Sequence, residues 1–436
     1  MGVGHSALLV KAGLFFVAGE VRTHDARRGL FLLGDRAHGL KDLGIDQAKV
    51  HSRPYTVCEN GSLRIAIDAI PLLVRSAGVK NYFFYWISHL RQLLGDPQVS
   101  LFPFLDHLPD LNHEGSIASP AGTLARQGLL YALNLWPNRA WDLIGPRTDI
   151  FHTTKLLNPP RRPRLTAHLH DLTCWLLPEL HQPPNVAAEK LFAERIWKRA
   201  AGLIAVSEST RRDAIRILGL NPDIVQVIYP GVPHPFFEAT AESAAVTCRK
   251  YGLARPYALY VGTVEPRKNL DRLLDSWQDL PASVRDPFDL VAIGPEGWQS
   301  AATMARLRSP SPGLSRLRYL GYVPEPDLPA LTAGAAVFLY PSLYEGFGFP
   351  VAQAMAAGVP VITSNLSSLP EITGGAALLV DPLSVAEIRA ALDRLLTSPA
   401  TRAQLSQAGR VQARRFHWDV CARQSVKFFE QVLGRA

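Results

Sequence analysis

Short apolar runs followed by loops and helical patterns recur along the chain from residue 63 onward. The first run, Leu63–Asp68, contains β-branched residues and ends in an acid, which predicts a buried strand. After a loop that contains Gly78, apolar side chains return at helical spacing over Tyr82–Leu94. A strand, a glycine-containing loop and a helix in this order are typical of the start of a doubly wound α/β sheet.

The same pattern continues to residue 229. Further buried strands are predicted at Ile150–Thr153, Leu165–His170, Gly202–Ser207 and Val225–Tyr229. Ser207 precedes a helical pattern over Glu208–Leu218 and is placed as the helix N-cap. Residues 233–242 have no period and include two prolines, so they are the predicted linker between two domains.

The second half of the chain repeats this alternation. Its predicted strands are Tyr257–Gly262, Phe288–Gly294, Arg318–Tyr322, Ala335–Tyr340, Val359–Thr363 and Ala377–Val380. Asn269 is placed as the N-cap of a helix with an apolar face, Pro350 in the first turn of a later helix, and Gly358 at that helix's end. The chain is therefore predicted to form two Rossmann-like α/β domains, with the binding site in the cleft between them.

These patterns divide the chain into four parts. We expect an N-terminal extension over 1–62, a first domain over 63–232, a second domain over 233–415 and an amphipathic terminal helix within 416–436. Residues 1–62 show no alternation of strands and helices. Two hypotheses account for them: an appendage, or a start codon placed too far upstream.

Composition supports a globular protein and narrows its partners. Hydrophobic residues make up 47% of the 436, and the formal net charge is +8. The first value excludes a disordered chain, and the second suits an anionic ligand or an anionic membrane surface. No zinc-finger, RNP or basic-zipper pattern is present, so no nucleic-acid partner is expected. The four cysteines form no C-x-x-C pair, which is typical of reduced thiols in the cytoplasm.

Three polar residues at predicted strand ends carry the candidate chemistry. Arg267 and Lys268 follow a strand and precede a helix start, where two cations beside free backbone N–H groups suit a diphosphate. Glu345 opens a turn in which Gly346 and Gly348 allow the backbone to approach a ligand. Its carboxylate is suited to accept hydrogen bonds from sugar hydroxyls, or to offset positive charge on a sugar ring. No metal site is expected, because the histidines and carboxylates form no ligand pattern.

Two long motifs resemble those of glycosyltransferase family 4, whose members are retaining enzymes of GT-B fold. The first is Ser342-Leu-Tyr-Glu-Gly-Phe-Gly-Phe-Pro-Val-Ala-Gln-Ala-Met-Ala-Ala-Gly-Val-Pro-Val-Ile, and the second is Tyr260-Val-Gly-Thr-Val-Glu-Pro-Arg-Lys-Asn-Leu. Shorter matches are Gly321-Tyr-Val-Pro, Val206-Ser-Glu-Ser-Thr and Ile228-Tyr-Pro-Gly-Val. The resemblance covers about residues 63–433. It implies sugar transfer from a nucleoside-diphosphate sugar with retained anomeric configuration.

The resemblance also assigns residues to the donor, which is a substrate, so no cofactor is expected. In the second, donor-binding domain, Arg267 and Lys268 would hold the diphosphate and Glu345 would contact the transferred sugar. The other residues that the resemblance places near the donor there are Tyr322 and Val323 at the base, Gly346, Phe347, Gly348 and Phe349 in the loop, and Gln353.

The first domain would bind the acceptor. The resemblance places His170 and Asp171 beside the reacting sugar as catalytic residues together with Glu345, and Gly78 in a loop near the donor phosphates or the acceptor. The helix around Trp418 would cross back onto this domain. A weaker likeness to enzymes of bacterial surface polysaccharide synthesis suggests mannose as the sugar and a glycan or lipid-linked acceptor. That acceptor would allow peripheral contact with the inner face of the membrane.

Gln353 is a departure from the family pattern. The family has a second glutamate eight positions after the first, which holds the donor ribose. Glutamine still forms hydrogen bonds, but without the charge that makes them about twice as strong. This departure leaves open a catalytically weak nucleotide-sugar-binding subunit of a glycan-assembly complex. A GT-B epimerase is a second alternative, but it would need inward catalytic carboxylates in the first domain, which the sequence does not offer. An oxidoreductase is disfavoured, because no G-x-G-x-x-G follows the first strand.

Overall fold

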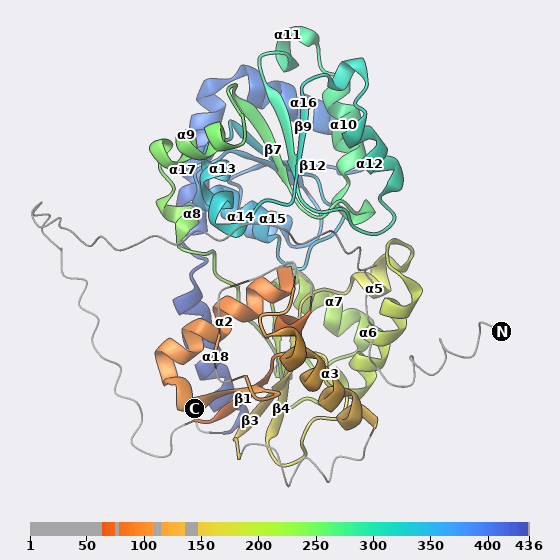
Figure 1. Cartoon of the computed structure of the whole chain (residues 1–436), viewed down its shortest axis with the longest axis vertical. Helices are drawn as coiled ribbons and strands as arrows, with labels where there is room; N and C mark the ends of the chain where they lie inside the picture. Colours follow the sequence, from red (N-terminus) through yellow and green to blue (C-terminus); the bar gives the residue numbers. More distant parts are fainter. Residues whose placement is uncertain are drawn as a thin grey trace, which may run out of the picture.

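The computed structural model describes residues 63–434 apart from 75–77, 106, 109–110, 112–114 and 136–146. The predicted extension over 1–62 lies outside the described residues. Within them, the chain forms two α/β domains stacked along the long axis of the molecule (Figure 1). Each domain is built on one six-stranded sheet.

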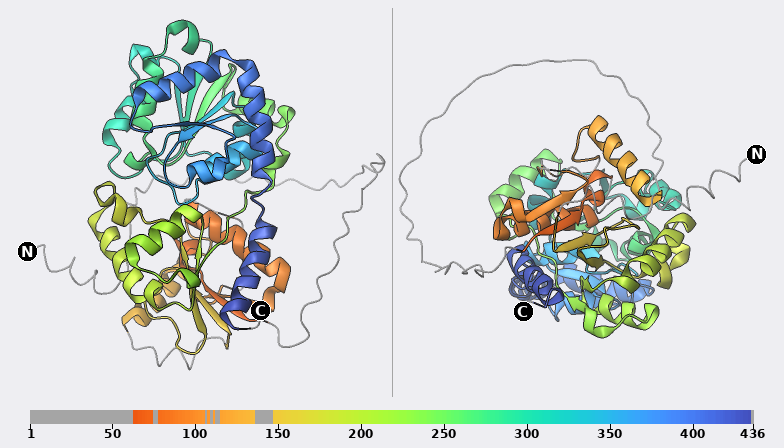
Figure 2. Two further views of the ribbon diagram at one scale, coloured as in Figure 1. Left: turned by 180° about the vertical axis from the view of Figure 1, so that it is seen from behind. Right: turned by 90° about the horizontal axis from the view of Figure 1, so that it is seen from below.

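All strands of the first sheet are parallel, in the order β2-β1-β3-β4-β5-β6. They are β1 (Ile65–Asp68), β2 (Val99–Phe102), β3 (Ile150–Thr153), β4 (Arg164–Leu169), β5 (Gly202–Ala205) and β6 (Val225–Val227). The helices of this part are α2 (Gly78–Leu94), α3 (Pro120–Leu135), α5 (Thr173–Leu176), α6 (Pro183–Arg195) and α7 (Glu208–Leu218). The strands are almost fully buried, because helices of this domain cover both faces of the sheet (Figure 2).

The second sheet is also parallel, in the order β12-β11-β10-β7-β8-β9. Its strands are β7 (Tyr257–Val261), β8 (Asp289–Ile293), β9 (Leu317–Gly321), β10 (Val337–Tyr340), β11 (Val361–Ser364) and β12 (Leu378–Val380). Its helices are α8 (Pro235–Glu238), α9 (Ala241–Lys250), α10 (Leu270–Gln278), α11 (Ala282–Arg285), α12 (Ala301–Arg308), α13 (Leu328–Ala333), α14 (Phe349–Ala356), α15 (Leu369–Thr373), α16 (Val385–Thr397) and α17 (Pro399–Ala413). The central strands β7 and β10 are neighbours, so the loops at their carboxyl ends meet.

The last helix, α18 (Trp418–Val432), returns to the first domain and lies beside α2 (Figure 2). The indole N–H of Trp86 donates to the hydroxyl of Ser425 over 2.9 Å. The rings of Tyr85 and Trp418 stack with centroids 5.8 Å apart. The amphipathic pattern of this segment is thus used to cover α2.

Two predicted helix caps have different outcomes. The hydroxyl of Ser207 accepts a hydrogen bond from the backbone N–H of Thr210 over 3.0 Å, which confirms the predicted N-cap. Asn269 does occupy the predicted N-cap position of α10, but its backbone is left-handed, with φ of 60°, and its side chain makes no capping hydrogen bond. Instead its amide group donates to the carbonyls of Pro341 and Pro382 over 2.9 and 2.7 Å. Asn269 therefore ties loops of the second domain together.

The segment predicted as a linker, 233–242, is partly helical. It contains α8 and the first residues of α9. Both helices pack against α13 of the second domain. The chain therefore enters the second domain soon after β6, without a long irregular stretch.

Candidate functional site

A buried ion cluster forms where the loops after β7 and β10 meet. Arg267 and Lys268 lie in a 3-10 turn, η7 (Pro266–Lys268), and Glu345 lies in the loop between β10 and α14. The ammonium group of Lys268 is 2.7 Å from Oε1 of Glu345, and Nη1 of Arg267 is 3.1 Å from Oε2. The structure thus brings together the three residues that carry the predicted donor chemistry.

Glu345 is held as a carboxylate. Its residue is only 7% exposed, and Oε1 also accepts from the hydroxyls of Ser342 and Tyr340 over 2.7 and 3.0 Å. Burial alone would raise its pKa, but the charges of Lys268 and Arg267 outweigh this effect and lower the pKa to about 2. The group is therefore ionised at neutral pH and compensates the cations.

Arg267 has a second anionic partner, Glu265, which the sequence reasoning missed. Nη2 of Arg267 lies 2.6 Å from Oε1 of Glu265. Burial opposes the charge on Arg267, but Glu345 and Glu265 raise its pKa above the ordinary value. Burial and the nearby Arg267 lower the pKa of Lys268. The available signal was an acid two residues before Arg267 inside the second long motif.

The Nε–H group of Arg267 is buried and has no hydrogen-bond partner within the described part of the chain. Nε2 of His170 and the hydroxyl of Tyr260 are also buried without a hydrogen-bond partner among the described residues. Buried polar groups in proteins are nearly always satisfied. The unpartnered Nε–H group of Arg267 within the ion cluster therefore indicates a place for a polar ligand.

The first domain meets this cluster through His170, which directly follows β4. A Cβ atom added at Gly346 would lie 1.7 Å from the backbone oxygen of His170, so only glycine allows this approach. Burial lowers the pKa of His170 to about 4, while Asp171 opposes the shift and Lys155 adds to it. The imidazole is therefore neutral at pH 7, and its ring stacks on that of His168 with centroids 5.5 Å apart in the first domain, while the backbone oxygen of His170 borders Gly346.

Two family sequence models match this chain. One, described as "Glycosyl transferases group 1", matches residues 250–412, and one described as "Glycosyltransferase Family 4" matches residues 77–234. The chain is 32% identical over 381 residues to O-antigen chain mannosyltransferase B of Escherichia coli, which covers 84% of this chain and all of that protein.

The chain belongs to glycosyltransferase family 4. It is also 29% identical over 248 residues to an MMP alpha-(1->4)-mannosyltransferase of Mycolicibacterium hassiacum, which covers 56% of this chain and 57% of that protein. The protein is a glycosyltransferase, as the motifs predicted.

Solved structures share its fold. Sucrose-phosphate synthase of Thermosynechococcus elongatus superposes with a TM-score of 0.66 at 21% identity, over 86% of this chain and all of the other. Anabaena HepE in complex with UDP-glucose superposes with a TM-score of 0.60 at 19% identity, over 85% and 98%. The predicted fold, GT-B with two facing Rossmann-like domains, is confirmed.

Within the glycosyltransferase, the loop from Gly346 to Phe349 uses its side chains for packing. Phe347 lies 5.3 Å from the ring of Phe416, and Phe349 stacks on Trp418 at 6.3 Å. Gly348, with φ of 95°, precedes α14 in a left-handed conformation that favours glycine. Because both phenylalanine side chains pack against other rings, the loop can contact a ligand mainly through its backbone N–H groups.

The other predicted site residues lie at element ends. Gly78 is the first residue of α2, and Asp171 accepts from the backbone N–H and hydroxyl of Thr173 over 3.0 and 2.6 Å at the start of α5. Tyr322 is 42% exposed, whereas Val323 is buried in the core.

Gln353 lies in α14 and is half-buried. Its side chain makes no hydrogen bond to any described residue of the glycosyltransferase, so the structure does not link it to the ion cluster. Across the same described ranges, no group of His, Cys, Asp and Glu side chains could hold a metal ion, and no helix is long and apolar enough to span a membrane.

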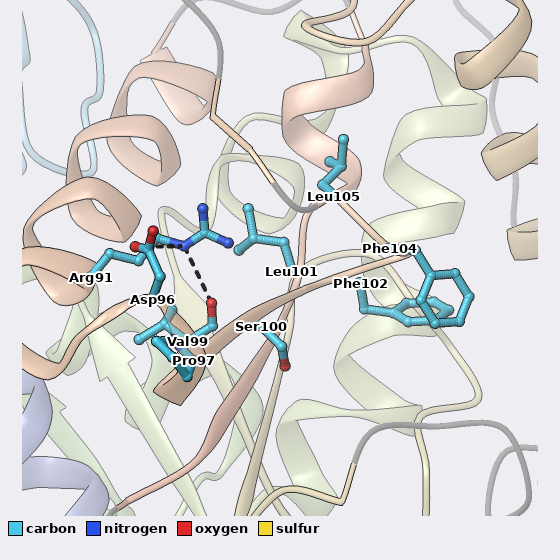
Figure 3. A pocket seen from close by; sticks show the side chains of 9 residues that line it. All are labelled: Arg91, Asp96, Pro97, Val99, Ser100, Leu101, Phe102, Phe104 and Leu105. Atoms are coloured by element: carbon cyan, nitrogen blue, oxygen red, sulfur yellow. Dashed lines mark hydrogen bonds and ion pairs between the residues drawn. The ribbon is translucent and has the colours of Figure 1, made fainter.

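A separate hollow of about 340 Å³ lies beside the edge strand β2 (Figure 3). The end of α2, the strand and the following loop line it, and the guanidinium of Arg91 donates to the carbonyl of Val99 within it over 3.2 Å. None of the predicted site residues contributes to this hollow. It is therefore not part of the donor site of the glycosyltransferase.

Proposed function

We propose that this glycosyltransferase transfers mannose from a nucleoside-diphosphate sugar to a glycan or lipid-linked acceptor, with retained configuration, in the synthesis of a bacterial surface polysaccharide. The similarity along 84% of the chain to an O-antigen chain mannosyltransferase supports the sugar and the process. The bound UDP-glucose in HepE, which has the same fold, supports a nucleotide-sugar donor.

The observation that carries the proposal is the ion cluster of Arg267, Lys268 and Glu345. Two cations whose side chains are only 13% and 12% exposed, one of them with an unpartnered N–H group, lie at strand ends in front of the facing domain. In the proposed reaction the departing diphosphate is stabilised by Arg267 and Lys268 as its negative charge grows. No cofactor is needed for this role, because these side chains supply the positive charge.

The sugar would lie between Glu345 and His170. The carboxylate of Glu345 stabilises positive charge on the sugar ring, and the neutral His170 imidazole forms a hydrogen bond with a sugar hydroxyl through Nε2. The acceptor hydroxyl attacks from the face that the diphosphate leaves, and its proton passes to the departing phosphate oxygen. That geometry retains the anomeric configuration.

A donor panel tests the proposal. GDP-mannose, UDP-glucose, UDP-galactose and UDP-N-acetylglucosamine are incubated with the protein and a mannose-terminated oligosaccharide, and the product linkage is read by NMR. We expect transfer from the mannose donor to give an α-linkage. Tight nucleotide binding without turnover of any donor would favour a binding subunit instead.

We also propose peripheral contact of the first domain with an anionic membrane. Exposed arginines, Arg161 and Arg162, lie just before β4, at the opposite end of the sheet from His170. A lipid-linked acceptor held there would reach the site through its sugar chain. In a flotation assay, the wild type should float with phosphatidylglycerol vesicles, and the double variant Arg161→Glu, Arg162→Glu should not. Equal binding of the wild type to neutral vesicles would contradict the proposal.

A further inference from the structure

Helix α7 of the first domain holds a carboxylate of the second domain at its N-terminus. The backbone N–H groups of its first two residues, Glu208 and Ser209, donate to the two oxygens of Glu371 in α15 over 2.8 and 3.1 Å. The hydroxyl of Tyr229 donates to the same carboxylate over 2.7 Å. Glu371 thus satisfies helix N–H groups that have no partner inside α7, at the end where the helix dipole favours an anion. Figure 1 shows α7 beneath α15 at the junction of the domains.

The first two turns of α7 also contact the Glu345 loop. The hydroxyl of Thr210, a fully buried residue, lies 3.2 Å from the carbonyl oxygen of Gly346 and 3.5 Å from that of His170. One turn further, Asp213 accepts from the hydroxyl of Tyr344 over 2.5 Å. Residues three apart share a helix face, so one face of α7 contacts the residues on either side of Glu345.

The start of α15 contacts that loop from the other side. The backbone N–H of Glu345 donates to the hydroxyl of Ser367 over 3.0 Å, and the hydroxyl of Ser368 lies 3.0 Å from the carbonyl oxygen of Glu345. Through Glu371, α15 is joined to α7; through these serines, it is joined to the Glu345 loop. Hydrogen bonds therefore connect the domain interface directly to the Glu345 loop.

We infer that Glu371 and Thr210 are positioning residues that set Glu345 against His170 by docking α7 onto α15 and the Glu345 loop. The inference rests on the proposed function, because it assigns them a role in the proposed transfer. We call these contacts of α7 with α15 and the Glu345 loop the dock. Arg267 and Lys268 lie wholly within the second domain, so nucleotide binding does not depend on the dock. Misplacing reacting groups by about 1 Å can cost about a hundredfold in rate, so loss of the dock reduces transfer while nucleotide binding is kept.

Two substitutions remove the dock with little change in shape. In Glu371→Gln an amide N–H₂ group faces the N–H groups of α7, and in Thr210→Val the hydroxyl is replaced by a methyl group. Thr210→Ser restores the hydroxyl. The matched control is Glu387→Gln, since Glu387 also accepts from a backbone N–H, that of Asp381 over 2.8 Å, but within the second domain.

The measurements are kcat for transfer, the dissociation constant of GDP by calorimetry, and the radius of gyration by X-ray scattering. For Glu371→Gln and Thr210→Val we expect kcat to fall at least about tenfold, with GDP binding unchanged and a larger radius of gyration for Glu371→Gln. Thr210→Ser and Glu387→Gln should match the wild type. Unchanged kcat, or a parallel loss of GDP binding, would overturn the inference.

The scattering measurement separates this inference from the proposed function. If the wild type transfers no sugar from any donor, the proposed function fails. The radii of gyration of the wild type and Glu371→Gln with GDP still report on the dock. Equal radii overturn the docking inference, and a larger radius for Glu371→Gln supports it.

Discussion

Replacing Glu345 by glutamine perturbs the buried ion cluster with little change in side-chain shape. In the native site Oε1 accepts from Lys268, Ser342 and Tyr340, while Oε2 faces Arg267. The glutamine carbonyl can take the place of Oε1, so the amide N–H₂ group then faces the guanidinium of Arg267, donor against donor. The variant therefore loses one ionic partner and leaves Arg267 in ion-pair contact with Glu265, with Asp171 as a weaker counter-charge.

Two arguments give the size of the effect on stability. The ordinary pKa of 4.5 and the value of about 2 in the fold correspond to about 3 kcal/mol of stabilisation of the ionised form. Removing one member of a buried ion pair costs about 3–5 kcal/mol. Because Glu265 still compensates Arg267 and the glutamine keeps its bonds at the Oε1 position, we expect the lower end, about 3 kcal/mol at pH 7.

Urea unfolding checks this magnitude, with Glu296→Gln as the matched control. Glu296 pairs with Arg308 at 2.7 Å, but both side chains are exposed, so its loss costs at most about 1 kcal/mol. The low pKa of Glu345 also fixes the direction in which this stabilisation changes with pH. A depressed carboxyl pKa stabilises the fold above pH 4.5 and stops doing so as pH falls toward 2. The gap between the wild type and Glu345→Gln should therefore shrink over that range.

The same variant separates binding from transfer. With Glu345 neutral, Lys268 and Arg267 are freer to meet a diphosphate, so GDP should bind equally well or more tightly. Transfer should fall at least about tenfold, or about 1.4 kcal/mol of barrier. A stability loss below about 1 kcal/mol, or a gap that does not close on acidification, would refute the ion-cluster reasoning, and near-normal transfer would refute the role of Glu345.

Four further outcomes are expected. Lys268→Ala should slow transfer at least about tenfold (about 1.4 kcal/mol) and weaken GDP binding, both measurable in the donor assay and by calorimetry. Gln353→Glu should bind the donor equally well or more tightly, and a clear loss in calorimetry would show a site adapted to the amide. Gly346→Ala should abolish transfer, because a methyl group would overlap the His170 carbonyl. Burial, with a smaller effect of His170, lowers the pKa of His152 from 6.5 to about 3. Below pH 6.5 the unfolded chain therefore binds a proton that the fold excludes, and stability falls by up to about 1.4 kcal/mol per pH unit; urea unfolding of His152→Gln should show a shallower slope.

The residues of the ion cluster could be predicted because each is marked by its immediate sequence neighbours. Arg267, Lys268 and Glu345 each follow a short apolar strand, and parallel strands bring such loops to one edge of a sheet. Strand β2 (Val99–Phe102) was not predicted, because its short apolar run lies between Pro97 and Pro103, which mark a loop rather than a strand. The side-chain role of Asn269 was not predicted, because the carbonyls that it bonds lie 72 and 113 residues away, which sequence neighbours do not reveal.

Contacts between the domains were beyond sequence reasoning for the same physical reason. Glu371 reads as an ordinary acid in the first turn of a short helix, yet it reaches N–H groups 163 and 162 residues earlier in the chain. Gly346 reads as a turn residue, and only the packed structure shows that it borders the His170 carbonyl. These constraints come from how two rigid sheets face each other, and no local period encodes that placement.

The charge balance of the site gives Gln353 a physical meaning. A glutamate at this position would hold the ribose through charge-assisted hydrogen bonds, which are about twice as strong as those of an amide. With glutamine there, donor affinity depends more on the diphosphate contacts of Arg267 and Lys268. Their side chains are only 13% and 12% exposed, so salt screens them little, and in the proposed reaction they lie where negative charge develops on the departing diphosphate. In the proposed reaction the weaker ribose contact would reduce ground-state binding of the donor, while the groups proposed to stabilise the transition state, including Glu345, are all present.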